Sequence, residues 1–277
     1  RGGNTLAAWS LTNLIRQFCD EFEVLIPSKA HSSGTLISLG ANTIIMTKQA
    51  TLGPIDPSLN SPLNPQNPQV PNNPQARLPV SVESIKGYFE LAKKDLQIKD
   101  TQSIANILIG LSNQVHPLVL GDVYRSRTQI QMLARKLLSK QIKDKKSIDK
   151  IIAFLCSDSG SHDYTIYRRE AKEELGLNIE KPDDDFYQLI KDTFTNIQNE
   201  LELKKAFDPN MILGTNSQMN YSCRRALIES IAGGTDVFVS EGTLLRNNQI
   251  ISQGPNLPPI QRVVIEDQRK FEGWKHE

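Results

Sequence analysis

The chain has 277 residues and a formal net charge of +1, so it is long enough to bury a substantial core and has no general attraction for nucleic acid or anionic membranes. No apolar stretch approaches the roughly 20 residues that span a bilayer. Its cysteines, Cys19, Cys156 and Cys223, are odd in number and far apart, which favours a reducing compartment over a disulfide framework. They show no metal-ligand spacing with the histidines, so we expect neither a metal nor a cofactor.

The first elements predict a helix, a strand and a small-residue turn. Apolar residues recur at helical spacing over residues 5–22, which predicts an amphipathic helix. The run from Val24 to Ile26, bounded by a proline, is typical of a buried parallel strand. Ser32 and Ser33 follow at a turn. A hydroxyl there would lie at the carboxyl end of the sheet, where open α/β folds bind ligands, although the two serines could equally be a helix N-cap pair.

The stretch from Ala30 to Met46, followed by residues 50–57, resembles the serine dehydrogenase proteinase family, a relative of signal peptide peptidase A in the Clp protease/crotonase superfamily. In that family a small residue precedes the nucleophilic serine, and a small residue and Gly-Thr follow it. The resemblance implies an α/β fold, a Clp/crotonase-like spiral of short parallel strands with flanking helices. It also implies that Ser32 is the nucleophile and that Ser33 takes the small position after it.

A glycine pair at the start of the chain is the second part of the resemblance. Family members place such a pair at the end of an early strand, where a backbone amide contributes to the oxyanion hole. Glycine suits this task because it lets the backbone approach a substrate closely. The resemblance therefore implies an oxyanion hole formed by the Gly2 or Gly3 amide together with the Ser33 amide. Because the chain begins inside this motif, we expect an upstream strand, and any leader or membrane anchor, to lie outside it.

Two lysines are candidates for the base that would activate the serine. A helix is predicted over residues 82–96, and Lys86 and Lys93 lie seven residues apart along its apolar edge. Relatives of signal peptide peptidase A use a Ser-Lys dyad, so the resemblance implies a lysine base. We favour Lys93, with Lys86 as the alternative. Either lysine could instead be a solvated surface residue.

Asp56 and His116 are candidate supporting residues. Where Clp peptidases have a triad histidine, this chain has Ile55 and Asp56, which counts against that triad. Asp56 could orient a partner or simply belong to a rigid turn. His116 precedes a proline at a predicted helix break, where it could act as a base or have a structural role.

Composition divides the rest of the chain. Residues 54–79 hold eight of the fifteen prolines, which predicts a long loop, either a lid over the active site or a solvated insertion. We expect a peptidase core over 1–140 that includes this loop. A helical extension over 141–210 would pack on the core, and a small β-rich segment of short strands would occupy 211–277.

A longer helix is predicted over residues 121–141. Its apolar positions, Leu133 among them, would face the core, and its cations, among them Arg125 and Arg127, would face outward. We interpret these cations as a solvated face and not as a nucleic-acid surface, because no aromatic residues alternate with them.

These patterns favour a serine endopeptidase with a Ser-Lys dyad that acts on a peptide or protein substrate. Superfamily members often assemble, so we expect a homo-oligomer, in the cytoplasm or on the reducing side of a membrane. An alternative is a catalytically inactive protein of the same fold that serves as a binding or scaffolding module in an oligomer. Acyl-CoA chemistry of the crotonase type is disfavoured, because that class needs no nucleophilic serine at this turn.

Overall fold

The computed structural model describes residues 3–55, 58–70, 73, 75–161, 163–251 and 260–277. The chain divides into two compact units, Arg1–Tyr187 and Gln188–Glu277. This division differs from the expected boundaries after residues 140 and 210. Residues beyond 140 belong to the first unit because a helical segment over 145–158 supplies several fully buried side chains to its main core.

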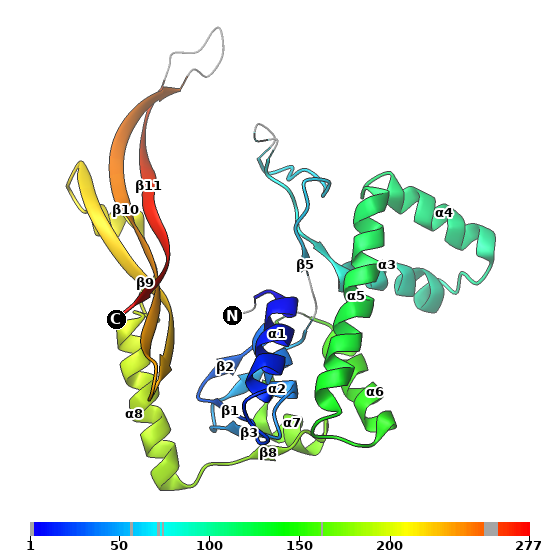
Figure 1. Ribbon diagram of the computed structural model, residues 1–277. Coiled ribbons are helices and arrows are strands. Elements are labelled where there is room, and N and C mark those ends of the chain that lie inside the picture. Colours follow the sequence, from blue (N-terminus) through cyan, green and yellow to red (C-terminus); the bar gives the residue numbers. More distant parts are fainter. Residues whose placement is uncertain (1–2, 56–57, 71–72, 74, 162, 252–259) are drawn as a thin grey trace. The chain divides into compact units, whose positions relative to one another are not determined.

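The first unit combines helices with short strands, and the predicted α/β class is confirmed (Figure 1). Its helical segments in the described part are α1 (Thr5–Arg16), α2 (Ser33–Leu39), α3 (Val82–Glu90), the π-helical η1 (Leu91–Asp95), α4 (Thr101–Ser112), α5 (Pro117–Leu138), α6 (Lys145–Ala153), the π-helical η2 (Phe154–Asp158) and α7 (Arg168–Glu173). Its strands are β1 (Glu23–Ile26), β2 (Lys29–Ala30), β3 (Thr43–Met46), β4 (Thr51–Leu52), β5 (Ser58–Leu59), β6 (Val80–Ser81), β7 (Ile166–Tyr167) and β8 (Ile179–Glu180).

Two small sheets place the turn that contains Ser32. In the first, β1, β3 and β8 are parallel in the order β1-β3-β8, with Glu23 opposite Thr43. In the second, β2 is parallel to β4, and β7 is antiparallel to β4. Strand β3 is buried along most of its length, as expected of a parallel strand covered on both faces. The chain leaves β2 and enters α2 through a turn of two residues, so Ser32 lies between a strand and a helix.

Helix α1 is shorter than predicted and buries a different face. It ends at Arg16, whose guanidinium donates to the Gly40 carbonyl at 2.7 Å and so turns the chain back. Its buried residues are Ala8 and Thr12, whereas Phe18, beyond the helix, is 84% exposed. The reason is close helix packing, since a Cβ on Gly40 would lie only 2.4 Å from the Thr12 side chain. Small residues, not large ones, therefore form the contact between α1 and the end of α2.

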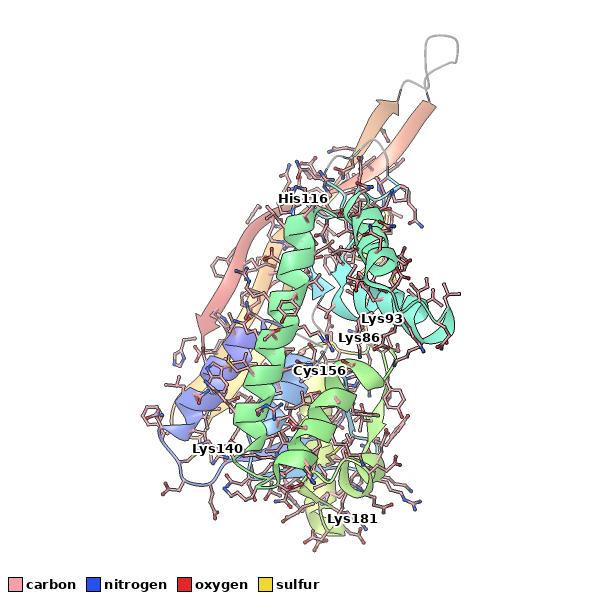
Figure 2. The ribbon with its side chains drawn as sticks, turned by 90° about the vertical axis from the view of Figure 1, so that its right-hand side faces the viewer. Lys86, Lys93, His116, Lys140, Cys156 and Lys181 are labelled. Atoms are coloured by element: carbon pink, nitrogen blue, oxygen red, sulfur yellow. The ribbon has the colours of Figure 1, made fainter. Side chains whose placement is uncertain are left out.

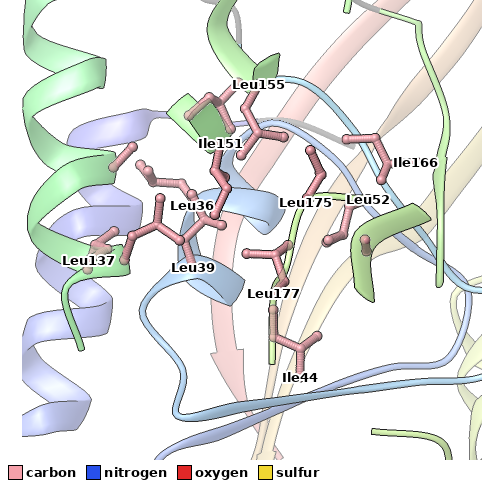
Figure 3. Packing of buried hydrophobic residues seen from close by; sticks show 14 of the residues in the cluster. Leu36, Leu39, Ile44, Leu52, Leu137, Ile151, Leu155, Ile166, Leu175 and Leu177 are labelled. Carbon is pink, nitrogen blue, oxygen red and sulfur yellow. The ribbon is translucent and has the colours of Figure 1, made fainter. Parts of the chain in front are cut away.

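The main core lies between α2, α5, α6, η2 and the two sheets (Figure 3). Leu36 and Leu39 of α2 are fully buried and lie in the same cluster as Leu137 of α5. Ile151 and Leu155 complete it from α6 and η2. The helix that follows Ser32 is thus anchored by apolar packing on several sides, so its amino end is held in one place.

Helix α5 begins four residues earlier than predicted, because Pro117 suits the first helical position and His116 caps it. The predicted burial of Leu133 is confirmed, and Leu137 is likewise buried. Among the described residues, no single helix is long and apolar enough to cross a bilayer. Helices α4 and α5 meet that criterion of length and composition only together, as a pair bent by 109°.

The second unit holds a long antiparallel sheet. Its described elements are the end of α8 (Asp184–Glu200), α9 (Pro209–Leu213), β9 (Gln218–Ser230), β10 (Gly234–Ile251) and β11 (Ile260–His276). The strand order is β11-β10-β9, and Leu213, Tyr221 and Leu244 form its small core. We expected short strands here. The observed strands are long because each residue of β10 pairs with a residue of β9, of β11 or of both. This pairing outweighs the weak strand preference of the local sequence.

Candidate active site

Ser32 has a backbone conformation that L residues rarely adopt. Its φ is 54° and its ψ is −110°, at the turn between β2 and α2. A helix N-cap residue normally has extended backbone and a side chain that accepts from the first turn, but the Ser32 side chain makes no capping hydrogen bond. Among the described residues, two other non-glycine residues, Gln97 and Glu202, have positive φ, and both follow helix ends, where it is common. Strain of about 1–3 kcal/mol at a strand-to-helix turn is typical of functional sites.

The Thr35 side chain holds this turn in place. Its Oγ1 is fully buried and lies 2.8 Å from the Ala30 carbonyl and 2.7 Å from the Gly53 carbonyl. It also accepts from the Gly53 amide at 3.2 Å. The single hydroxyl proton can serve only one of the two carbonyls at a time. One side chain therefore joins the segment before Ser32 to the segment after β4.

His31 also contacts the segment that the Thr35 side chain joins to the turn. Its Nε2 lies 3.1 Å from Thr51 Oγ1. Its ring also packs on Gly53, where a Cβ would lie 2.8 Å from the imidazole Cγ. Only glycine therefore fits at this position without displacing the ring. The motif glycine of the Leu-Gly-Pro turn thus has a packing role beside Ser32.

Ser33 joins the start of the chain to the turn. Its Oγ donates to the Gly3 carbonyl at 2.7 Å and accepts from the Gly3 amide at 3.2 Å. In this conformation the Gly3 amide is therefore already engaged and does not point at an oxyanion, which departs from the expectation for Gly3. The Ser33 amide is the first of α2 and has no acceptor within its own helix. Gly2 lies outside the described residues.

The two candidate lysines have different surroundings (Figure 2). Lys86, on α3, is 21% exposed, and its Nζ lies 3.5 Å from Glu90 and 4.0 Å from Glu83. Burial alone raises the pKa of Glu90, but the ammonium groups of Lys86 and Lys94 outweigh it and hold that pKa below its ordinary value of 4.5. Lys93, on η1, is exposed and pairs with no carboxylate in the described ranges.

A chain of hydrogen bonds links the Lys86 neighbourhood to the Ser32 turn. Ser157 of η2 donates its hydroxyl proton to Glu83 at 3.3 Å. The Ile55 amide, two residues after Gly53, donates to the Leu155 carbonyl, also in η2, at 2.9 Å. Helix α3 therefore begins beside the segment that the Thr35 hydroxyl ties to the turn. Lys86 is about two helical turns closer to this junction than Lys93.

His116 caps α5. Its Nδ1 accepts from the Leu118 amide at 3.2 Å, and its side chain is exposed. Helix α2 packs near the opposite end of α5, where Gln141 donates to the Leu39 carbonyl at 3.0 Å. With a rise of 1.5 Å per residue, His116 lies on the order of 20 Å from the start of α2. The structure thus gives His116 a capping role. Asp56 lies outside the described residues.

Sequence reasoning assigned no role to Thr35 or Gly53, although both belong to the motif that carried the resemblance. The pattern did contain a signal, because the hydroxyl of a threonine at a turn commonly bonds to backbone groups. What it could not show is that the bond partner is 18 residues away. Within the described ranges, no three His, Cys, Asp or Glu side chains gather where they could hold a metal ion.

Comparison with known proteins agrees with this geometry. Residues 1–84, which include the Ser32 turn and the Gly53 contact, match the family model of ClpP-like SDH-type serine proteinases. Over this stretch the chain is similar to that family, which supports the predicted resemblance. The uncharacterized proteins MJ0137 and MJ1495 of Methanocaldococcus jannaschii are 29% and 26% identical to it, over 65% and 64% of this chain. The chain spans about half the length of these curated relatives, 50% and 49% respectively. No solved structure matches it.

Replacing Thr35 with valine tests the link between the two segments. Thr35→Val keeps the side-chain shape but leaves the buried Gly53 amide and a carbonyl without a partner. We expect the free energy of unfolding in urea to fall by about 1–3 kcal/mol. The matched control is Ser38→Ala, because the buried Ser38 hydroxyl bonds only within its own helix, to the Gly34 carbonyl. Equal losses in the two variants would contradict the proposed role of Thr35.

Proposed function

We propose that this chain is the core of a serine endopeptidase in which Ser32 is the nucleophile. The observation that carries the proposal is the positive φ of Ser32 at a strand-to-helix turn, with its hydroxyl making no capping bond. Such a turn presents Oγ to a substrate and keeps it out of the helix. The match of residues 1–84 to a serine proteinase family supports the same assignment.

The reaction follows from this geometry. Ser32 Oγ attacks the carbonyl carbon of a peptide bond while its proton passes to a nearby base, and the carbonyl π electrons move onto oxygen to give a tetrahedral oxyanion. Collapse of this intermediate breaks the C–N bond, and the protonated base gives its proton to the leaving amine. Water then hydrolyses the Ser32 ester with the same base accepting and returning a proton.

The Ser33 amide is the proposed first donor to the oxyanion. It lies at the amino end of α2, where the backbone N–H has no helical acceptor and the helix dipole favours negative charge. Gly2 or Gly3 would supply the second donor. For Gly3 this requires exchange of its present bond to Ser33 Oγ. A single such donor typically contributes about 3–4 kcal/mol to transition-state stabilisation.

We assign the base to Lys86 in preference to Lys93, the residue that the sequence favoured. Lys86 is largely shielded from solvent, and its neighbour Glu83 is bonded to η2, which in turn bonds the segment after Gly53. A shielded lysine with fixed partners is better oriented than an exposed one. Glu83 and Glu90 lie within 4.0 Å of the Lys86 Nζ and hold the side chain in place.

Finer features of the family enter as part of the proposal. The short parallel strands would belong to a Clp/crotonase-like spiral, with the long antiparallel sheet of the second unit as an appendage. The enzyme would act on a peptide or protein as a homo-oligomer, in the cytoplasm or at the reducing side of a membrane.

A fluorophosphonate probe tests the nucleophile directly. We expect the full-length protein to become covalently labelled, and Ser32→Ala to lower labelling at least a hundredfold, because the neighbouring Ser33 hydroxyl is engaged by Gly3. Ser139→Ala, which removes an exposed hydroxyl bonded to the Lys136 carbonyl, is the control and should label normally. If folded native protein never labels, the inactive scaffolding alternative replaces the peptidase assignment. Labelling that persists in Ser32→Ala would place the nucleophile elsewhere.

The same assay separates the two lysines. We expect Lys86→Met to reduce the labelling rate about a hundredfold or more, since general base catalysis typically contributes 10²–10⁴-fold. Lys99→Met, which removes an exposed cation further along the chain, is the control. Loss of labelling in Lys93→Met, with Lys86→Met unaffected, would reverse the assignment.

A further inference from the structure

A cavity of about 600 Å³ lies between α3, η1, α4 and α5. Its size falls within the range of small-molecule sites, roughly 300–1,000 Å³. The walls are mostly apolar and are formed by Ile85, Phe89, Leu108, Leu111, Leu120 and Val123. Helix α4 buries none of its residues, and Leu108 is 48% exposed, so this apolar surface is left uncovered by the described chain.

The polar groups of this cavity are mainly cations. Four basic side chains and one carboxylate line it, and the carboxylate, Glu90, is already paired with Lys86 and Lys94 at 3.5 and 3.4 Å. Lys93 and Arg127 remain without a carboxylate partner in the described part of the chain. Arg127 Nε is buried and has no hydrogen-bond partner there. The sequence predicted a solvated Arg127, but the structure turns it to the cavity wall.

We propose that this cavity binds a long-chain fatty acid, with the acyl chain against the apolar walls and the carboxylate on Arg127 and Lys93. A carboxylate matches the planar guanidinium of Arg127 in charge and in shape. An unbranched hydrocarbon chain matches the mostly apolar walls, in which Tyr124 and Glu90 are the polar residues besides the cations. The cations therefore match the charged end of an amphiphile, and the apolar walls match its hydrocarbon chain.

An extended peptide fits the cavity less well. Helices form all of its walls, and the backbone N–H and C=O groups of helices are used within the helices. A bound peptide would therefore find no backbone partners for its own amides, and each unsatisfied amide costs free energy on burial. An acyl chain has no such groups. This difference decides in favour of a lipid acid.

Lys86, the proposed base, forms part of the cavity wall, so a bound molecule would lie next to it. The binding proposal does not depend on the peptidase proposal, however, because it rests on Arg127 and Lys93, which have no assigned part in the reaction at Ser32. A binding assay on Ser32→Ala protein keeps the two separate.

The experiment is titration of the full chain with cis-parinaric acid, a fatty acid whose fluorescence rises when it leaves water. We expect saturable binding that oleic acid displaces. Oleyl alcohol, which lacks the charge, and hexanoate, which lacks the long chain, should each compete at least tenfold less well. Arg127→Gln and Lys93→Gln should each weaken binding about tenfold, and Arg127→Lys should weaken it less than Arg127→Gln.

Arg125→Gln is the matched control, because Arg125 lies on the same helix, is 81% exposed and pairs with Asp122 outside the cavity. Circular dichroism and thermal unfolding confirm that each variant is folded. Absence of saturable binding by the native chain would overturn the proposal. So would equal competition by oleyl alcohol, equal competition by an apolar peptide with a free carboxylate, or unchanged affinity in folded Arg127→Gln.

Discussion

The Thr35 hydroxyl is the interaction on which the candidate site depends. Its Oγ1 accepts from the Gly53 amide and lies within donating distance of the Ala30 and Gly53 carbonyls, so it fixes the spacing between β2, which leads into Ser32, and the segment after β4. A buried hydroxyl in this position cannot exchange its partners for water. The unfavourable φ of Ser32 can therefore persist, because the chain on both sides of it has no freedom to relax.

Packing in the core is the second constraint on the candidate site, because it fixes helix α2. Helix α2 is fixed along its length by buried leucines, and at its end by the close approach of Gly40 to α1 and α5. The carboxyl end of α2 is fixed by packing and its amino end by hydrogen bonds. The amide of its first residue, Ser33, is therefore held in one orientation. A site that stabilises a developing charge needs such preorganised donors, since reorganising them during the reaction would cost free energy.

The sequence predicted the parts of this site that depend on local chemistry. The strand-turn-helix order around Ser32 and the buried face of α5 follow from hydrophobic periodicity and small-residue motifs, and the α/β class follows from the family resemblance. The end of α1 could not be predicted, because Arg16 stops the helix through a carbonyl 24 residues away. The buried face of α1 was missed for a related reason, since close packing on Gly40 selects Thr12 over larger side chains.

Charged residues were the hardest to place. Periodicity assigned Arg127 to solvent, and it placed Lys86 and Lys93 along the apolar edge of their helix without deciding whether they are buried. The structure separates them by their partners, since Lys86 is paired with two glutamates, whereas Lys93 and Arg127 line an apolar cavity without a carboxylate in the described residues. Such differences arise from how α3, α4 and α5 pack together, which no single segment specifies.

The most direct test of the central claim compares the unfolding free energies of Ser32→Gly and Ser32→Ala. If Ser32 is held at positive φ, glycine relieves the strain and alanine does not, so Ser32→Gly should be more stable by about 1 kcal/mol. At Ser38, within α2, the order should reverse, because glycine is about 0.5–1 kcal/mol less favourable than alanine in a helix. A Ser32→Gly variant no more stable than Ser32→Ala would contradict the strained turn.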